Sequence, residues 1–408
     1  TQSFTPCDDL AEVMPLPTCT MVVSVANGDK MVSIDVPPAL SSSPFTPHWN
    51  RYPLTYVAPK ITYPLFDNLD GDLTKEVWSC VPWSEYFDDI RGIDDAPPDE
   101  RPSRGCKTRF KAVWDDDHLF IAALIETDFE TVAEFKERNS PIFQKDSDFE
   151  VFIDPIGSCH WYKELELNAI NTIWNLMLDK PYNDGGGEHS ARIAKPDEEK
   201  YYEVYHQKTA VRVLKGRLNT PGEGTIWSLE LAISYKDVFS HIEENPKQPT
   251  VGSMWRINFS RVENKGDINW TWQPQIAWNP KARRFSGFVN MHLPDAWGFI
   301  VFGNPTGQDE GSEQIPKDSS WPVRLTAMHI YYAQAAYFEE NRTYASTLDQ
   351  LKDFVDSDIT DPFDILIDLD DSGGYLVTVS GSPDGTQATV THDRLLRISV
   401  EGNGDAYN

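Results

Sequence analysis

The sequence predicts a mainly β fold: an antiparallel two-sheet β-sandwich with an N-terminal arm and a small C-terminal α+β module. Between residues 59 and 303, short runs of β-branched and aromatic residues alternate with clusters of turn residues. The segment 304–321 is rich in Pro, Gly and acidic residues, which indicates a linker. Beyond that linker, apolar residues recur at helical rather than strand spacing.

The N-terminal segment, residues 1–58, is rich in Pro, Ser and Thr, and we expect it to be an arm. Its strand-like stretch at 21–36 has Asn-Gly-Asp at its centre, which is typical of a hairpin turn. Within the predicted sandwich, residues 59–303, strands are expected at RFKAVW (109–114), LFIAALIE (119–126) and DFEVFID (148–154).

The C-terminal part, residues 322–408, is predicted to be a separate α+β module. Residues 323–341 form one amphipathic helix in this interpretation, with Leu325, Met328, Tyr332, Ala335 and Ala336 on its apolar face. A second short helix is expected at 347–355. The strand-like runs FDILIDL, GYLVTVSG, QATVTHD and LLRISVEG follow, with Gly and Asp turns between them.

Charge and cysteines narrow the class of protein. The chain has 36 basic and 64 acidic residues, a net charge of -28, which repels nucleic acid and anionic membrane surfaces. It opens at TQSFTPCDDL without Met or an apolar leader, so we expect a secreted, extracellular protein whose signal peptide has been removed. Glycosylation sequons stand at Asn258, Asn269 and Asn341, which suits a glycoprotein. Spacing favours disulfide bonds between Cys7 and Cys19 and between Cys80 and Cys106, leaving Cys159 unpaired.

Two acidic strands form the most informative block. In DFEVFID and the following YKELELNA, alternate residues share a face, and the short intervening loop makes the strands antiparallel neighbours. Carboxylates such as Glu150 and Glu166 then confront each other, which is destabilising. Three features could offset this repulsion: a bound cation such as Ca²⁺, the nearby Arg109 and Lys111, or solvation on an exposed face.

The ordered segments 63–78, 110–126, 148–157, 162–182, 226–238, 255–263 and 289–302 resemble the family 9 carbohydrate-binding modules and the family-9-like proteins of the DOMON-like superfamily. The resemblance implies a β-sandwich that binds glycans, often with structural Ca²⁺. It places Glu150 at a sugar-contacting carboxylate and Glu166 roughly where the family has an Arg. The family's two sugar-clamping Trp residues have no counterpart, because Phe143-Gln144 and the segment 288–292 stand in their places.

A sugar site combines flat aromatic rings, which pack on apolar C–H faces, with polar groups that bind hydroxyls. The predicted aromatic platforms are Phe143, Trp174 and Trp272. The predicted polar partners, beside Glu150 and Glu166, are Asn168, Asn171, Gln275, Asn290 and His292. For calcium, the turn that contains Asp67, Asp70 and Asp72 concentrates carboxylates around a Gly, although it lacks the full EF-hand pattern.

Three functions remain open from the sequence. The first is a binding protein for a neutral oligo- or polysaccharide, since the acidic face disfavours anionic glycans. The second is a glycoside hydrolase that uses Glu150 and Glu166 as its carboxylate pair. The third is a structural subunit of an extracellular assembly, with contacts between copies of the chain.

Overall fold

The computed structural model describes residues 43–401, except residue 245, residues 306–314 and the side chain of Gln144. Ser43–Asn408 is one compact unit. The expected hairpin at 21–36 and the expected pair Cys7 and Cys19 lie outside the described residues.

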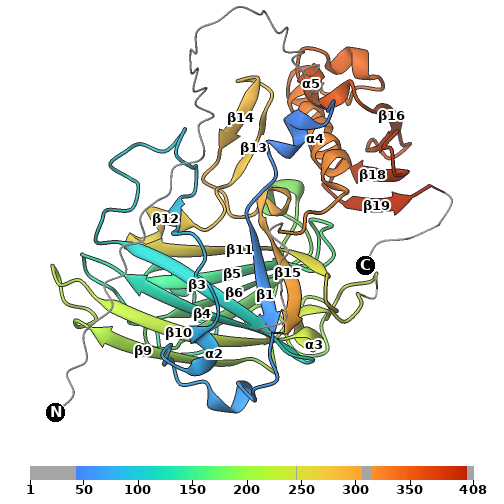
Figure 1. Cartoon of the computed structure of the whole chain (residues 1–408). Helices are drawn as coiled ribbons and strands as arrows, with labels where there is room; N and C mark the ends of the chain where they lie inside the picture. The colour runs from blue at the N-terminus through green and yellow to red at the C-terminus, as the bar shows by residue number, and fades with distance from the viewer. Residues whose placement is uncertain (1–42, 245, 306–314, 402–408) are drawn as a thin grey trace, which may run out of the picture. The chain divides into compact units, whose positions relative to one another are not determined.

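The N-terminal two-thirds of this unit is built from strands joined by short helical turns (Figure 1). The strands are β1 (Thr55–Lys60), β2 (Asp88–Asp89), β3 (Lys107–Trp114), β4 (His118–Glu126), β5 (Asp148–Asp154), β6 (Tyr162–Asn168), β7 (Ile173–Leu178), β8 (Glu188–His189), β9 (Lys208–Lys215), β10 (Ile226–Ser234), β11 (Met254–Glu263), β12 (Ile268–Thr271), β13 (Ile276–Asn279), β14 (Arg284–Gly287) and β15 (Gly298–Pro305). The α-helices are α1 (Thr46–Trp49), α2 (Glu76–Ser79) and α3 (Tyr235–Val238), and the 3-10 turns are η1 (Phe66–Asn68), η2 (Ile142–Gln144), η3 (Tyr182–Asp184), η4 (Asn264–Gly266) and η5 (Pro294–Ala296).

The mainly β class is confirmed, and most of these strands belong to one 13-stranded sheet. Its order is β8-β7-β6-β5-β11-β15-β1-β3-β4-β10-β9, with β12 attached to β11 and β2 attached to β12. Neighbours pair antiparallel except β1, which is parallel to both β15 and β3. The sequence predicted two antiparallel sheets, whereas β1 links the two halves of a continuous path.

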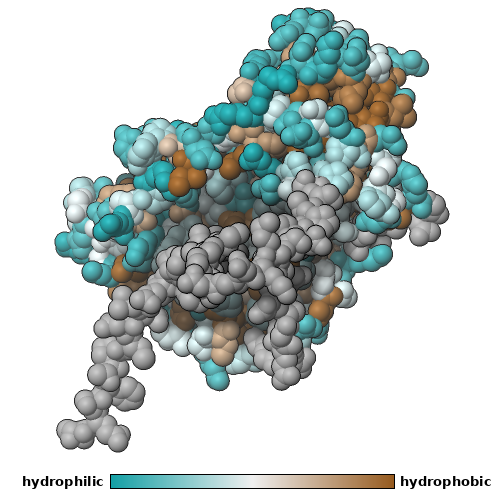
Figure 2. All heavy atoms as spheres, turned by 45° about the horizontal axis from the view of Figure 1, so that its top comes forward, coloured by the Kyte–Doolittle hydropathy of each residue, from teal (hydrophilic) through white to brown (hydrophobic). Residues whose placement is uncertain are grey.

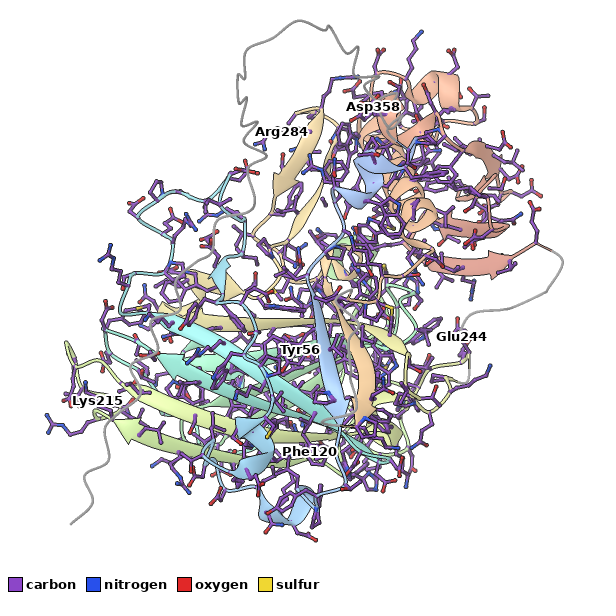
Figure 3. The ribbon with its side chains drawn as sticks, viewed as in Figure 1. Tyr56, Phe120, Lys215, Glu244, Arg284 and Asp358 are labelled. Atoms are coloured by element: carbon purple, nitrogen blue, oxygen red, sulfur yellow. The ribbon has the colours of Figure 1, made fainter. Side chains whose placement is uncertain are left out.

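The two halves of this path face each other across a shared core. The rings of Phe110 on β3 and Phe259 on β11 lie 3.9 Å apart between centroids, although three steps of the sheet path separate their strands. Inward residues alternate with outward ones along each strand, as a pleated backbone requires. Tyr56 and Phe120 are buried in this core, whereas Lys215 is exposed at the end of β9 (Figure 3).

Part of the expected arm belongs to the compact unit, so the boundary at residue 58 is wrong. Strand β1 begins at Thr55 and supplies the link between the two sheet halves. Helix α1 holds His48, whose Nε2 lies 3.1 Å from Thr326 Oγ1 and 3.0 Å from the Ile359 carbonyl oxygen. The Pro- and Ser-rich composition of the segment concealed these two short elements.

The C-terminal module has the predicted α+β content. Helix α4 (Trp321–Asn341) is followed by η6 (Leu348–Leu351), α5 (Ser357–Thr360) and the antiparallel sheet β16 (Asp364–Leu369), β17 (Tyr375–Ser380), β18 (Thr386–Thr391) and β19 (Leu396–Val400). Ala335, expected on the apolar face of α4, is exposed, while Val323, Ala327 and Ile330 are buried. Apolar side chains also gather on the surface of this module (Figure 2).

The module is tied to the sandwich through a buried arginine. Arg394, between β18 and β19, donates to Asp184 at 2.7 Å and to Asp295 at 2.8 Å, and it is 3% exposed. Asp184 and Asp295 belong to the loops η3 and η5 of the sandwich. The contact therefore fixes two sandwich loops against the C-terminal module.

The structure bears on the expectations about disulfide bonds, glycosylation and membrane spanning. Cys80, Cys106 and Cys159 are free, so the expected Cys80–Cys106 disulfide is wrong; the Cys106 thiol lies 3.1 Å from Asp128 instead. Asn258 is fully buried in β11 and donates to the Gln273 carbonyl, so it cannot accept a glycan in the folded chain. Within the described residues no helix has the length and apolar character that crossing a membrane requires.

Candidate functional site

A cavity of about 470 Å³ lies over the outer face of strands β5, β6 and β7. Loops from distant parts of the sequence complete its walls. Its lining includes Ile90, Phe143, Glu150, Phe152, Glu164, Trp174, Leu176, Tyr182, Glu188, Arg192, Val262, Gly266, Asn269, Val289, Asn290, Met291 and His292. The cavity therefore combines aromatic rings, amides and carboxylates, and we take it as the candidate site.

Strand alternation places the acidic residues on this outer face, as the sequence predicted. Phe149 and Val151 point into the shared core, whereas Glu150 belongs to the face that carries the cavity. Strands β5 and β6 are antiparallel neighbours as expected, with Glu150 opposite Glu166, and β7 pairs antiparallel with β6, with Glu166 opposite Trp174. One row across the sheet therefore runs from an indole to two carboxylates.

The aromatic residues of the cavity stack on each other. The rings of Phe143 and Trp174 lie 5.0 Å apart with 17° between their planes, and the guanidinium of Arg192 lies 4.8 Å from the Trp174 ring. Trp174 is only 4% exposed, and its indole N–H has no hydrogen-bond partner within the described residues. Tyr182, in contrast, is 47% exposed and offers its ring at the cavity wall.

His292 supplies a neutral polar group to the cavity. Its Nδ1 lies 3.0 Å from the hydroxyl of Tyr162, and the backbone N–H of His292 donates to the side-chain oxygen of Asn290 at 2.8 Å. Burial lowers the pKa of His292 to about 4, so the imidazole is uncharged at neutral pH. Its ring packs edge-on against Tyr182, at 4.8 Å between centroids.

Glu150, Glu164 and Glu188 line the cavity itself, and the pKa values of the first two are raised. Burial raises the pKa of Glu150 to about 7, while the neighbouring Ser260 acts in the opposite direction. The pKa of Glu164 is also raised, first by burial and then by the charge of Glu150. Near neutral pH, Glu150 can therefore accept a hydrogen bond when ionised or donate one when protonated.

Below the cavity floor lie two further acids, Asp148 and Glu166, both with 0% exposure. The possibility that these carboxylates lie on a solvent-exposed face is therefore wrong. Arg109 and Lys111 do not compensate for these acids either: the Arg109 guanidinium lies 4.3 Å from the Trp83 ring, and Lys111 donates to the Trp78 carbonyl. Of the three possible offsets, a bound cation remains.

Five predicted site residues line the cavity: Phe143, Glu150, Trp174, Asn290 and His292. Five others do not. Asn168 is buried and holds a loop by donating to Asp146 at 2.7 Å and to the Phe135 carbonyl at 2.9 Å. Trp272 is 1% exposed in the core against Phe110 and Phe259. Gln275 is buried, Asn171 is exposed outside the cavity, and Glu166 lies beneath its floor.

Sequence reasoning missed Glu164, Tyr182, Glu188 and Arg192. Glu164 could have been predicted, because it lies two residues before Glu166 and therefore on the same face of β6. Glu188 and Arg192 form an ion pair four residues apart in a loop region, and no periodic pattern marks that pair. The 182–192 segment reaches the cavity only because the chain folds back after β7.

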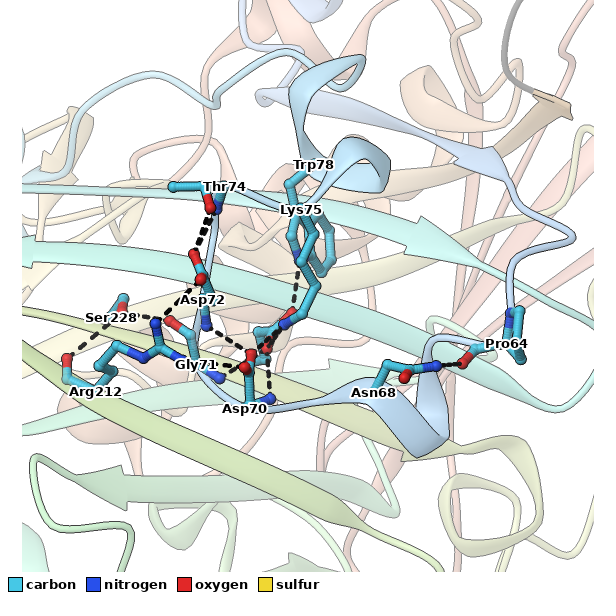
Figure 4. Close-up of polar contacts among 11 residues, drawn as sticks. Pro64, Asn68, Asp70, Gly71, Asp72, Thr74, Lys75, Trp78, Arg212 and Ser228 are labelled. Carbon is cyan, nitrogen blue, oxygen red and sulfur yellow. Dashed lines mark hydrogen bonds and ion pairs between the residues drawn. The ribbon is translucent and has the colours of Figure 1, made fainter.

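The acidic turn proposed for calcium is held by basic residues (Figure 4). The Asp70 carboxylate lies 2.5 Å from Lys75 Nζ and 3.0 Å from Arg212, and Asp72 lies 3.0 Å from the same Arg212. Beneath them, the buried Glu230 accepts bonds from the backbone N–H groups of Asp70 and Gly71. The arrangement is that of a salt-bridged turn, and calcium bound by Asp67, Asp70 and Asp72 stays a prediction.

A second cavity of about 360 Å³ lies between helix α4 and the sandwich. Apolar and aromatic residues such as Trp278, Phe285 and Met328 dominate its lining, with Arg256 among them. Its lining has one carboxylate, Asp295, which is paired with Arg394, whereas three carboxylates line the first cavity. A sugar, which has hydroxyls around its whole edge, is less well matched there.

No protein-family profile matches this chain, and no curated protein matches it. Solved structures similar to it include carbohydrate-binding proteins. One is a putative carbohydrate-binding protein from Bacteroides uniformis ATCC 8492, with a TM-score of 0.40 and 12% identity, covering 61% of this chain and 99% of that one. Others are a family 9 carbohydrate-binding module from Caldicellulosiruptor kristjanssonii in complex with cellotriose (TM-score 0.35, 14% identity, 64% of this chain and 100% of that one) and in complex with glucose (TM-score 0.35, 14% identity, 65% and 100%). Identity and TM-score are both low, so function has to be argued from the cavity.

Proposed function

We propose that this protein binds a neutral oligo- or polysaccharide in the cavity over β5, β6 and β7. The observation that carries the proposal is the composition of the lining: Trp174, Tyr182 and Phe143 stand beside carboxylates, amides and a neutral imidazole. Sugars present apolar C–H faces together with hydroxyls that both donate and accept, and this lining matches both features. The ordered sequence segments that resemble the family 9 modules and the DOMON-like superfamily support the same conclusion.

The charges of the cavity favour a neutral ligand. Glu150, Glu164 and Glu188 line it, and Arg192 among the lining residues is paired with Glu188. An anionic sugar would face uncompensated carboxylates at short range, where salt screens little. With a net charge of -28, the protein as a whole also repels anionic polymers, and we propose that it acts outside the cell.

The test is a titration of the purified chain with neutral glycans that a glycan array has identified. Cello-oligosaccharides are suitable first probes. Glu164→Gln removes one charge from the cavity wall while preserving shape, and loss of a charged hydrogen bond weakens binding by about 1.5–3 kcal/mol, roughly 10- to 100-fold. Glu223→Gln is the matched control, because Glu223 pairs with Arg217 away from the cavity.

If wild type and Glu164→Gln bind every tested glycan with equal affinity, this cavity is not the binding site. Binding confined to sulfated or uronic polymers would overturn the neutral-ligand part. Loss of binding in the Glu223→Gln control would indicate a general effect of charge, and the cavity assignment would then fail as well.

A second candidate function is glycoside hydrolysis, which the raised pKa values of Glu150 and Glu164 favour. The pair first proposed, Glu150 and Glu166, does not fit, because Glu166 is fully buried beneath the floor and does not line the cavity. Glu164 replaces it as the candidate partner of Glu150. Release of reducing ends from neutral polysaccharides, abolished by Glu164→Gln, would support this function, and no release supports binding alone.

A further inference from the structure

We propose that Asp148, Glu150 and Glu166 bind one divalent cation of the calcium class beneath the cavity floor. The proposal goes beyond glycan binding, because Asp148 and Glu166 lie below the cavity and only Glu150 belongs to its lining, and the metal alone is sufficient to test it. It is also distinct from the acidic turn at Asp70 and Asp72.

The three carboxylates converge at the distance that a shared ion requires. One oxygen from each residue lies within 4.8 Å of the others. Calcium–oxygen distances are about 2.3–2.6 Å, so two ligands on opposite sides of one Ca²⁺ are up to about 5 Å apart. Sheet register produces this convergence, since Asp148 and Glu150 are two residues apart on β5 and Glu166 faces Glu150 from β6.

An unpartnered carboxylate is the second observation. Neither side-chain oxygen of Glu166 accepts a hydrogen bond from an N–H or hydroxyl group in the described part of the chain, at 0% exposure. Asp148 uses one oxygen to accept from the Val262 N–H, and its other oxygen has no partner. Ser260, opposite Glu150 on β11, is fully buried, and its hydroxyl makes no bond of acceptable geometry. Buried polar atoms are ordinarily paired, so this group of oxygens indicates a missing ligand.

No basic side chain of the described residues neutralises these carboxylates. Across the described residues no Lys, Arg or His forms an ion pair with Asp148, Glu150, Glu164 or Glu166. The nearest buried arginine on β11, Arg261, pairs with Glu263 at 2.7 Å. Arg192, whose guanidinium lies 4.8 Å from the Trp174 ring, pairs with Glu188. The repulsion within the cluster is therefore uncompensated by the chain itself.

Shared protons are the alternative to a metal ion. Two carboxyl groups that share a proton approach to ordinary hydrogen-bond distance. Glu164 and Glu166 make one contact of this kind, and it involves neither Asp148 nor Glu150. The donors are all hard oxygen atoms, without nitrogen or sulfur, which favours Ca²⁺ over Zn²⁺ or Cu²⁺. A fully buried set of carboxylates also suits Ca²⁺ better than Mg²⁺, which usually retains several waters.

The experiment uses the full chain freed of metal with a chelator. Calcium is titrated by calorimetry, and the melting temperature is recorded with and without Ca²⁺. The expected result is one bound ion per chain and a higher melting temperature with Ca²⁺, because a ligand that binds the native state stabilises it. Absence of both effects overturns the proposal.

Two variants locate the ion. Glu166→Gln removes a ligand charge and should weaken calcium binding by at least about tenfold. Asp72→Asn makes the same charge change in the rival acidic turn and should leave the affinity unchanged. The reverse pattern, with binding lost only in Asp72→Asn, assigns the ion to the turn and overturns the proposal.

A luminescent ion provides a readout that does not depend on the stability of a variant. Tb³⁺ occupies oxygen sites of the calcium type, and Trp174, directly opposite Glu166 in the sheet register, is placed to transfer excitation to it. We expect Trp-sensitised Tb³⁺ emission that Ca²⁺ displaces, and emission that Ca²⁺ does not displace overturns the site. Calcium binding and glycan binding are measured separately, so failure of either proposal is distinguishable from failure of the other.

Discussion

The carboxyl cluster predicts that the apo protein loses stability as the pH rises through the acidic range. Burial raises the pKa of Glu150 from 4.5 to about 7. Between these values the native chain retains a proton that the unfolded chain has released, so stability falls as the pH rises. The stabilisation from this group is fully present below pH 4.5 and lost above pH 7. A shift of about 2.5 pKa units corresponds to roughly 3 kcal/mol, at about 1.4 kcal/mol per unit.

Glu150→Gln is the perturbation that tests this reasoning. Gln cannot ionise, so between pH 5 and 7.5 in chelator the unfolding free energy of the variant should decline less than that of wild type, by roughly 2 kcal/mol. Urea denaturation at a series of pH values measures the difference. Asp72→Asn is the control, because hydrogen bonds from Thr74 lower the pKa of Asp72 and give its contribution the opposite sign. Parallel pH profiles for wild type and Glu150→Gln would refute the reasoning.

Three further predictions concern other parts of the chain. Glu230→Ala should destabilise the protein by roughly 3–5 kcal/mol in urea denaturation, because it leaves the Lys75 ammonium and the buried Trp78 indole N–H without the carboxylate that they contact; a change below about 1 kcal/mol, which is typical of a surface ion pair, would contradict this role. Trp174→Phe should weaken glycan binding by roughly 2- to 10-fold through loss of aromatic surface at the cavity wall, measured by calorimetry, and unchanged affinity would contradict that role. Cys80 is exposed and should react with a maleimide in the native chain, whereas Cys106 should react only after unfolding; a protected Cys80 would restore the disulfide hypothesis.

Local patterns predicted the strands that form the site. Alternation in DFEVFID and YKELELNA places Phe149 and Leu165 in the core and Glu150 on the opposite face, and the short intervening loop predicts the observed antiparallel pairing. Pattern alone did not predict that both faces are buried. The acidic face is covered by loops that arrive from elsewhere in the chain, including the segments that carry Tyr182 and His292.

Aromatic residues show why half of the predicted site could not be found from sequence. Trp174 and Trp272 look equivalent as residues, yet one lines the cavity and the other packs between Phe110 and Phe259 in the core. The difference comes from which side of a strand each ring occupies and what lies above it. Similarly, the Pro-rich composition near residue 50 gave no indication that β1 joins the two sheet halves through parallel pairing.

Hydrogen–deuterium exchange with and without a bound glycan tests the central claim most directly, because it locates the ligand. Sugar binding in the cavity over β5, β6 and β7 predicts increased protection in the segments that line it, around Phe143, at 174–192 and at 289–292. Residues around the second cavity, such as Trp278 and Phe285, should be unaffected. Protection confined to that second cavity, with no change over β7 and the 182–192 loop, would contradict the proposed site.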